Sequence, residues 1–514
     1  MANDNIFSTV MNGAGDWFAK KLASYMQDAI GREGNILARY YSGDQRPALE
    51  IKYDKKTGKY IDDNIMQNFV GLAIDRSVSR LYQGGVDFEP PKLTTPTKDE
   101  NGMMVEVSSM QDEYLDRVWD LNKKEILLYQ VGLFGAVHGT CYIKIRPNAK
   151  RDPYSGKLFP ALVAINPRSI RIKTDAEDMD DVEQYKIEYT CHEERDGRNM
   201  EVTHTEITKH AKPEQGEMVE GEQPDTWVIE HYEKVGNMQT VLIDSIAWEY
   251  DFPPIIHWKN LPSLESCYGS SEVDDVVNVQ DKSNFVVSNT AKIIKFHAHP
   301  QTIITGSSAK SAEPVDTSAS TMLAFPNADT KAYNLEMQSD LVSSREFAND
   351  LRQSIMDIAR EVDPASITSR LGALTNFGIR VIYSDALQKN DTKRQLYGDA
   401  FQELNRRLLV LAGWTGEESN PGSVSWGDPL PTNIVEDAQA DKIILEMGLV
   451  DKETLYSRYK NRYGVNWETV QANLIKEQEA ANATNTNIGA TILRNFGQGI
   501  GTPQTNETIK APNL

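Results

Sequence analysis

Residues 270–297 read SSEVDDVVNVQDKSNFVVSNTAKIIKFH, and this stretch decides the fold. Its apolar side chains recur at helical spacing throughout, which predicts one long amphipathic helix that His299-Pro300 would end. At about 1.5 Å per residue the helix is roughly 40 Å long. Residues 339–363 show the same pattern and predict a second long helix. Its apolar positions step by three or four residues and are Phe347, Leu351, Ile355, Ile358 and Val362.

The segment between the two predicted helices, residues 298–338, is short strands and a loop rich in Ser, Ala and Thr, too polar to build a core. The helices therefore form a hairpin in which each helix buries only one apolar stripe. Their remaining apolar positions need neighbours. Copies of the same hairpin around a rotation axis would supply them, so the sequence favours a ring-forming protein.

Around the hairpin the sequence predicts a mixed α+β protein that is mainly helical. Further helices are predicted at residues 65–82, 110–134, 379–412, 433–447, 451–463 and 466–482, the first two ended by Gly84-Gly85 and by Gly135. Strands are predicted at residues 86–91, 140–146, 161–172, 184–191, 201–208, 227–234 and 240–246. Residues 15–30 carry one apolar helical face, which would dock on the protein itself or lie on a membrane.

The charge and the apolar content of the sequence limit the classes of protein to which the chain can belong. The 514 residues include 54 basic and 75 acidic side chains, a net charge of −21, which is opposite to a protein that grips DNA by neutralising phosphates. A conduit that lets DNA slide is compatible with this charge. No window approaches the roughly 18–20 apolar residues of a membrane span, and the N-terminus lacks a signal-peptide pattern, so we expect an intracellular protein without a membrane partner.

Five motifs in order resemble the phage portal protein family, especially its SPP1-like branch. They are NFVGLAIDRSVSRLYQGGVDF at 68–88, GTCYIKI at 139–145 followed by INPRSI at 165–170, YGSSEVDDVVNVQDKSN at 268–284, VSWGDPLP at 424–431 and GLVDKET at 448–454. The similarity covers most of residues 60–480 and includes the two predicted long helices. One departure concerns the Ser-Gly that this branch often carries before a long helix, where this chain has Asn376-Phe377-Gly378.

The resemblance implies the portal fold with its named parts. These would be a wing at 1–268, stem helices at 269–297 and 339–363 joined by a small α/β clip at 298–338, a tunnel loop at 364–378, a long wing helix at 379–413 and a helical crown at 414–484. The departure at Asn376 leaves the end of the tunnel loop open. Residues 485–514 are rich in Asn, Thr and Gly, and we expect them to be disordered.

The resemblance also implies a function and partners. Portal proteins form rings of about twelve subunits at one capsid vertex, a closed cyclic assembly. They pass double-stranded DNA during packaging and ejection, and they associate with the terminase large subunit, with major capsid and scaffolding proteins, and with head-completion or adaptor proteins. We therefore expect a virion protein, present in the host cytoplasm during assembly, with no enzymatic activity, cofactor or metal.

Five basic residues are candidates for facing DNA in the channel: Lys292, Lys295, Arg345, Arg352 and Arg370. Repeated around a ring, each would become a ring of charge that contacts phosphates without reading bases. The alternatives are local. Lys292 and Lys295 also suit the C-terminal end of a helix dipole, and Arg345 and Arg352 could pair with acidic residues of a neighbouring subunit. Arg370 is the strongest candidate because its loop has no packing role.

The motifs of catalysis are missing from the sequence. There is no phosphate-binding P-loop, no HExxH and no GxSxG, and Gly497-Gln-Gly-Ile-Gly lies in the polar tail. Cys141, Cys191 and Cys267 are far apart, which argues against a zinc site and a disulfide framework. The acidic run 175–183 is a solvated turn, with cation binding between subunits as the alternative. Two other readings stay open: a different connector or minor head protein, and a DNA-processing enzyme with scattered acidic residues.

Overall fold

The computed structural model forms two compact units, Met1–Leu430 and Pro431–Leu514, which are described separately. The described residues are 36–55, 58–89, 97–98, 104–105, 107–175, 177–195, 197–210, 227–236, 238–264, 266–298, 302–305, 331–334, 341–363, 376–430, 434–450, 452, 455–456 and 470–477. The predicted helix at 15–30 and the tail 485–514 lie outside them. Among the described residues, no helix is both long and apolar enough to cross a membrane.

The first unit begins with a helical stretch at 36–42, a small hairpin of β1 (Lys52–Asp54) and β2 (Lys59–Ile61), and helix α2 (Phe69–Leu81). Asn68 caps α2, because its side chain accepts a hydrogen bond from the Gly71 amide at 3.0 Å. The helix ends just before Gly84 and Gly85, both at positive φ, as the sequence predicted.

The predicted single helix at 110–134 is wrong, because two helices occupy this region. They are α3 (Val107–Leu121) and α4 (Lys124–His138), and Lys123 separates them at φ 54°. The buried Asn122 fixes this break, since its amide donates to the Val118 and Pro160 carbonyls at 2.8 and 3.0 Å. Gly135 does not end α4, which continues to His138 and is capped by Gly139 at φ 81°.

Gly135 has a different role from the predicted one. A Cβ atom at this position would overlap the Tyr397 hydroxyl and the Cys141 thiol, so glycine lets α4 approach α9 and the sheet. Gly139 likewise meets Gly269, where a Cβ on either residue would overlap the carbonyl oxygen of the other. Two of the sequence motifs, which begin at residues 139 and 268, therefore meet backbone to backbone.

Two antiparallel sheets hold eight of the sixteen strands that the structure describes. The smaller has the order β13 (Ile255–Lys259), β6 (Thr140–Arg151), β7 (Leu158–Ala164). The larger is a five-stranded meander of β8 (Ile170–Thr174), β9 (Val182–Arg195), β10 (Arg198–His210), β11 (Trp227–Val235) and β12 (Val241–Trp248). The strand predicted at 161–172 is thus two strands, separated by a 3-10 turn, Pro167–Ser169.

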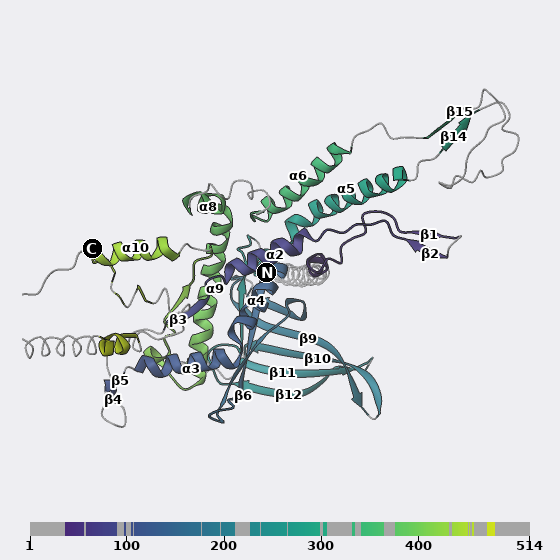
Figure 1. The fold of residues 1–514 in the computed structure, drawn as a ribbon. Coiled ribbons are helices and arrows are strands. Elements are labelled where there is room, and N and C mark those ends of the chain that lie inside the picture. The colour runs from purple at the N-terminus through teal and green to yellow at the C-terminus, as the bar shows by residue number, and fades with distance from the viewer. Residues whose placement is uncertain are drawn as a thin grey trace, which may run out of the picture. The chain divides into compact units, whose positions relative to one another are not determined.

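The predicted helical hairpin is present. It consists of α5 (Asp274–Ala298) and α6 (Val342–Ile358), which run side by side away from the sheets (Figure 1). Strands β14 (Thr302–Thr305) and β15 (Lys331–Asn334) pair within the connecting segment. The predicted end of the second helix at Asp363 is wrong: α6 ends at Ile358, and Arg360 at φ 52° turns the chain.

The predicted helix at 379–412 is also two helices, α8 (Asn376–Ile382) and α9 (Ser384–Leu411). Helix α8 begins three residues before the expected start, so residues 376–378 are helical rather than loop. Helix α9 is central to the first unit. Its buried Tyr397, Phe401 and Leu408 belong to a core that also takes in α3, α4 and the three-stranded sheet.

Short elements complete both units. Strand β3 (Val86–Glu89) pairs with β16 (Ser423–Trp426), which follows a 3-10 turn at Gly416–Ser419, and β4 (Thr97–Lys98) pairs with β5 (Met104–Val105). Beside the first pair, Gly84 and Gly427 approach so closely that neither has room for a Cβ.

The second unit contains α10 (Ile434–Glu446) and a helical stretch at 470–477, within two of the predicted helices.

Candidate functional site: a buried ion network at the hairpin base

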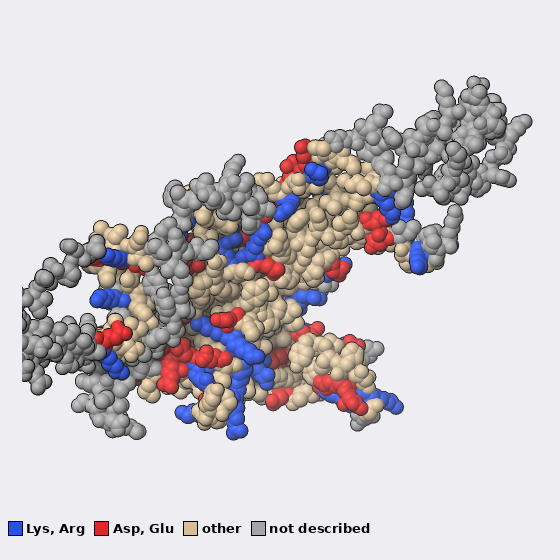
Figure 2. Space-filling view, in the orientation of Figure 1, with Lys and Arg blue, Asp and Glu red and all other residues tan. Residues whose placement is uncertain are grey.

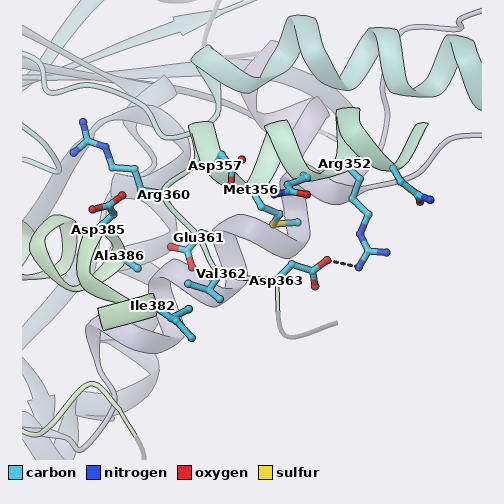
Figure 3. Close-up of a pocket in the computed structure, with 12 residues that line it drawn as sticks. Arg352, Met356, Asp357, Arg360, Glu361, Val362, Asp363, Ile382, Asp385 and Ala386 are labelled. Carbon is cyan, nitrogen blue, oxygen red and sulfur yellow. Dashed lines mark ion pairs between the residues drawn. The ribbon is translucent and has the colours of Figure 1, made fainter. Parts of the chain in front are cut away.

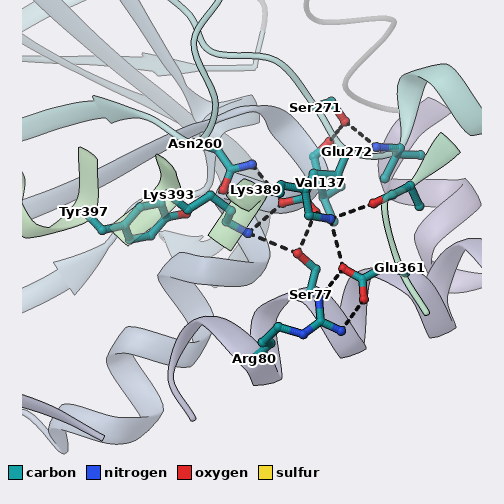
Figure 4. Close-up of polar contacts among 12 residues, drawn as sticks. Ser77, Arg80, Val137, Asn260, Ser271, Glu272, Glu361, Lys389, Lys393 and Tyr397 are labelled. Atoms are coloured by element: carbon teal, nitrogen blue, oxygen red, sulfur yellow. Dashed lines mark hydrogen bonds and ion pairs between the residues drawn. The ribbon is translucent and has the colours of Figure 1, made fainter. Parts of the chain in front are cut away.

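Four segments far apart in the sequence converge where the helical hairpin joins the rest of the first unit. They are α2, the residues just before α5, the residues just after α6, and α9. Together they bring five charged side chains into a buried cluster, which we call the base network: Arg80, Glu272, Glu361, Lys389 and Lys393 (Figure 4). Charged groups are seldom fully buried unless they are paired, so a buried cluster of five is unusual.

Glu272 is the centre of the base network. Its Oε1 accepts from Lys393 Nζ at 2.6 Å and from the Asn260 amide at 3.0 Å. Its Oε2 accepts from Lys389 Nζ at 2.9 Å and from the Ser77 hydroxyl at 2.7 Å. Four donors therefore satisfy both carboxylate oxygens, as burial of a full charge requires.

Glu361 forms the second half of the base network. Arg80 donates to both of its carboxylate oxygens, at 2.9 and 2.6 Å, in a bidentate pair. Lys389 joins the two halves, because its Nζ also reaches Glu361 Oε1 at 3.0 Å and the Ala359 carbonyl at 2.7 Å. The early end of α6 now has a physical reason: the turn at Arg360 brings Glu361 to these cations.

The electrostatic balance keeps these groups charged. Burial alone would raise the pKa of Glu272, but Lys393 and Lys389 outweigh it and hold that pKa well below its usual range. Burial alone would lower the pKa of Lys389, but Glu272 and Glu361 outweigh it and raise that pKa. A buried network of this kind adds little net stability over apolar packing, yet breaking it is costly. Its effect is to fix how both hairpin helices meet α2 and α9.

A polar chain extends the base network towards the sheet. Asn260, which donates to Glu272, accepts from the Tyr397 hydroxyl at 2.9 Å. That hydroxyl lies 3.1 Å from the Cys141 thiol in β6. Burial raises the pKa of Cys141 to about 12, so the thiol is protonated and acts as a packing group rather than a nucleophile.

A cleft of about 580 Å³ lies beside the base network, between the end of α6 and the start of α9 (Figure 3). Its lining mixes acidic and basic side chains, among them Arg352, Arg360, Asp363 and Asp385. No single sign of charge dominates this lining, and the amides of Arg360 and Glu361 at the turn already donate to the Asp357 and Met356 carbonyls, so the cleft lacks the free amides of a phosphate-binding nest. It borders residue 363, beyond which the chain is next described at residue 376.

The residues predicted to face DNA differ in whether they form ion pairs within the chain. Lys295 Nζ pairs with Asp63 at 2.7 Å, and Arg352 pairs with Asp363 at 2.7 Å while its guanidinium lies 5.4 Å from the Phe69 ring centre. Lys292 and Arg345 are exposed, and within the described part of the chain neither takes part in an ion pair. Arg370 lies outside the described residues.

The base network was not predicted from the sequence, although one signal was present. Along α9 the buried positions Ala386, Lys389, Lys393, Tyr397 and Ala400 are spaced by three or four residues. Two lysines therefore lie in line with apolar core residues, which indicates buried cations that need acidic partners. The sequence does not say which carboxylates those partners are.

Comparison with known proteins agrees with the order of elements. The family model described as phage portal protein, SPP1 Gp6-like, matches residues 34–484 of the 514. No curated protein matched the chain. The family is a structural, non-enzymatic component of the phage capsid, and its members form rings through which DNA passes. Because the match covers most of the sequence, the chain belongs to the phage portal protein family.

Proposed function

We propose that this chain assembles through its helical hairpin into a ring of about twelve subunits, a closed cyclic arrangement of identical interfaces. The observation that carries this proposal is the apolar surface of the hairpin. Phe285 and Ile294 on α5 are 47% and 53% exposed in the single chain, and Phe347 on α6 is 52% exposed. Large apolar side chains that stay half exposed along both helices are what packing against a neighbouring copy would cover.

A groove that Ile294 helps to line supports the same proposal. It has a volume of about 330 Å³ and lies between α5 and α6, where small and apolar side chains such as Val287, Ala291 and Ala348 line it together with the basic Arg345 and Arg352. Such a groove can receive a bulky side chain from an adjacent hairpin. Figure 2 shows that much of the hairpin surface on this face is neither acidic nor basic, so packing rather than charge would hold the subunits together.

Ring formation is tested with charge introduced into this surface. Phe347→Glu and Phe285→Glu should each abolish rings in negative-stain images and in native mass measurements, because a neighbouring hairpin would bury the new carboxylate. Leu264→Glu is the matched control: Leu264 is apolar, 98% exposed and outside the hairpin, and this variant should still form rings. A wild-type chain that is a monomer, or hairpin variants that form normal rings, would contradict the proposal.

We further propose that Lys292 and Arg345 contact DNA in transit, along with Arg370. Their support is the absence of an acidic partner for Lys292 and Arg345 among the described residues, whereas Lys295 and Arg352 already neutralise acidic groups. The chain carries 54 basic and 75 acidic side chains, a balance that suits weak and transient contact with phosphates.

The DNA contacts are tested in packaging assays over a range of salt concentrations. Lys292→Ala, Arg345→Ala and Arg370→Ala should change packaging efficiency and its salt response, because each removes one ring of charge. Lys295→Ala is the control, since the charge of this residue is paired with Asp63. Variants that package with unchanged efficiency and salt response would remove these residues from the channel.

The remaining assignments follow from family membership. We propose a wing at 1–268 and 379–413, a stem at 269–297 and 339–363, a clip at 298–338, a tunnel loop ending before α8, and a crown at 414–484. The partners proposed are the terminase large subunit, major capsid and scaffolding proteins, and head-completion proteins, first met in the host cytoplasm. In this scheme the base network lies where the stem joins the wing.

A further inference from the structure

The five-stranded sheet carries a second polar cluster, separate from the base network. Cys191 and Glu193 alternate along β9 and so face the same side of the sheet. His204 on β10 is directly opposite Tyr189, which brings its imidazole to that same side. The three donor atoms, a thiol sulfur, a carboxylate oxygen and an imidazole nitrogen, all lie within 4.8 Å of one another.

The distances within this cluster are close to those around a tetrahedral metal ion, with one pair of atoms nearer together than such ligands would be. Glu193 Oε1 lies 2.8 Å from His204 Nε2 and 3.5 Å from Cys191 Sγ. Zinc bonds of about 2.0–2.3 Å at tetrahedral angles place such ligand atoms about 3.3–3.7 Å apart. Small side-chain rotations would therefore open the triangle enough for the ion. Sulfur, nitrogen and oxygen donors in this combination are those that zinc prefers.

Neighbouring residues already orient the donors. Arg195 donates to Glu193 Oε2 at 2.7 Å, which leaves Oε1 directed at Cys191 and His204. The other imidazole nitrogen, His204 Nδ1, lies 3.7 Å from Glu233 Oε1 on β11. Carboxylates beside a ligand histidine and hydrogen bonds to a ligand carboxylate are the usual outer partners of a metal ion.

We propose that Cys191, Glu193 and His204 bind one Zn²⁺ ion, with a fourth position open to water. Arg195 pairs with both Glu193 and Glu233, so one positive charge faces two carboxylates and the group keeps a net negative charge that a divalent cation can neutralise. Zinc would tie β9 to β10 near their connection. The cysteine spacing argues against a zinc site, and only the pairing of the strands assembles these donors.

The proposal is tested with the full-length protein after dialysis against a chelator. Addition of Co²⁺ should produce tetrahedral ligand-field bands and a thiolate-to-metal charge-transfer band, at one ion per chain. Cys191→Ser should remove the charge-transfer band, and His204→Gln should weaken binding at least tenfold. Glu233→Gln should weaken it less than His204→Gln does, because it removes a nearby negative charge but no ligand. Cys267→Ser, which changes a cysteine outside the cluster, should bind as the wild type does.

A measurement on the wild-type chain covers the case in which a variant fails to fold. Zn²⁺ should slow alkylation of the Cys191 thiol, followed by peptide mass spectrometry, and leave alkylation of Cys267 unchanged. A wild-type protein without a thiolate band, a band that survives in folded Cys191→Ser protein, or alkylation of Cys191 that ignores Zn²⁺ would each overturn the proposal. None of these readouts depends on ring formation or DNA packaging.

Discussion

Replacing single charges of the base network should reveal an asymmetry between its acids and its bases. The network contains three cations, Arg80, Lys389 and Lys393, and two carboxylates, Glu272 and Glu361, so its formal charge is 3 − 2 = +1. Glu272→Gln raises that buried charge to +2, whereas Lys393→Met lowers it to zero. We therefore expect loss of the carboxylate to be the more damaging change.

The contacts give the size of the difference. Glu272→Gln leaves the fully buried Lys393 without a carboxylate partner: the new amide oxygen and the Ser77 hydroxyl at 3.3 Å can accept its hydrogen bonds, but neither carries a charge. An uncompensated buried charge of this kind costs about 4 kcal/mol. Lys393→Met leaves Glu272 paired with Lys389 at 2.9 Å and hydrogen-bonded by Ser77 and Asn260. The loss is then one charge-assisted hydrogen bond, about 2 kcal/mol.

The assay is urea unfolding at fixed protein concentration, because assembly would make apparent stability depend on concentration. Tryptophan fluorescence is a suitable signal, because the ring centre of Trp258 lies 5.6 Å from that of Tyr397, in the core beside the base network. The double variant Glu272→Gln/Lys393→Met should be more stable than Glu272→Gln alone, because it removes the uncompensated ammonium group. If Lys393→Met costs as much as Glu272→Gln, or the double variant is the least stable, the charge argument is wrong.

Three further predictions concern pH and backbone packing. The pKa of Glu272 is held below its usual value, so the ionised carboxylate stabilises the fold above about pH 4.3, and this stabilisation is lost as the pH falls further. In urea unfolding at acid pH, the free energy of unfolding of Glu272→Gln should therefore fall less steeply with pH than that of the wild type. Burial, with help from Lys259, lowers the pKa of His257 to about 4, so protonation opposes folding and stability should fall by about 3 kcal/mol as pH drops from about 6.5 to 4. His257→Gln should flatten the curve of unfolding free energy against pH in that range, and an unchanged slope would show that His257 does not titrate there. Gly139→Ala should destabilise far more than Gly156→Ala in thermal unfolding, because both glycines have positive φ but only Gly139 abuts another backbone; equal losses would refute the close approach to Gly269.

The base network holds the ends of both hairpin helices against α2 and α9. The apolar outer surface of α5 and α6 would be covered only by neighbouring copies, whereas the foot of each helix is fixed within its own chain. A helix that is fixed at one end and packed laterally along its length keeps its position in a ring. Weakening the base network should therefore loosen the hairpin before it unfolds the sheets.

The sequence by itself determined the long hairpin helices, the strand-rich region and the family. Apolar residues at helical or alternating spacing specify an element through local geometry alone, so α5, most of α6 and β6 lie where they were expected. The helix end expected at Gly84 and Gly85 was found, whereas the one expected at Gly135 was wrong: α4 ends just before Gly139, and Gly135 is needed for close packing.

Only the tertiary structure decided where the helices break and which charges meet. Helix α3 ends where the Asn122 side chain donates a hydrogen bond to the Pro160 carbonyl in β7. Glu361, just after the end of α6, pairs with Arg80, a residue 281 positions away in the sequence. In the sequence, Glu272 is one acidic residue before a helix, and Lys389 is one lysine on another. Spacing along one element records which face a residue occupies, but the partner of a buried charge belongs to a different element, so it is fixed only when the chain folds.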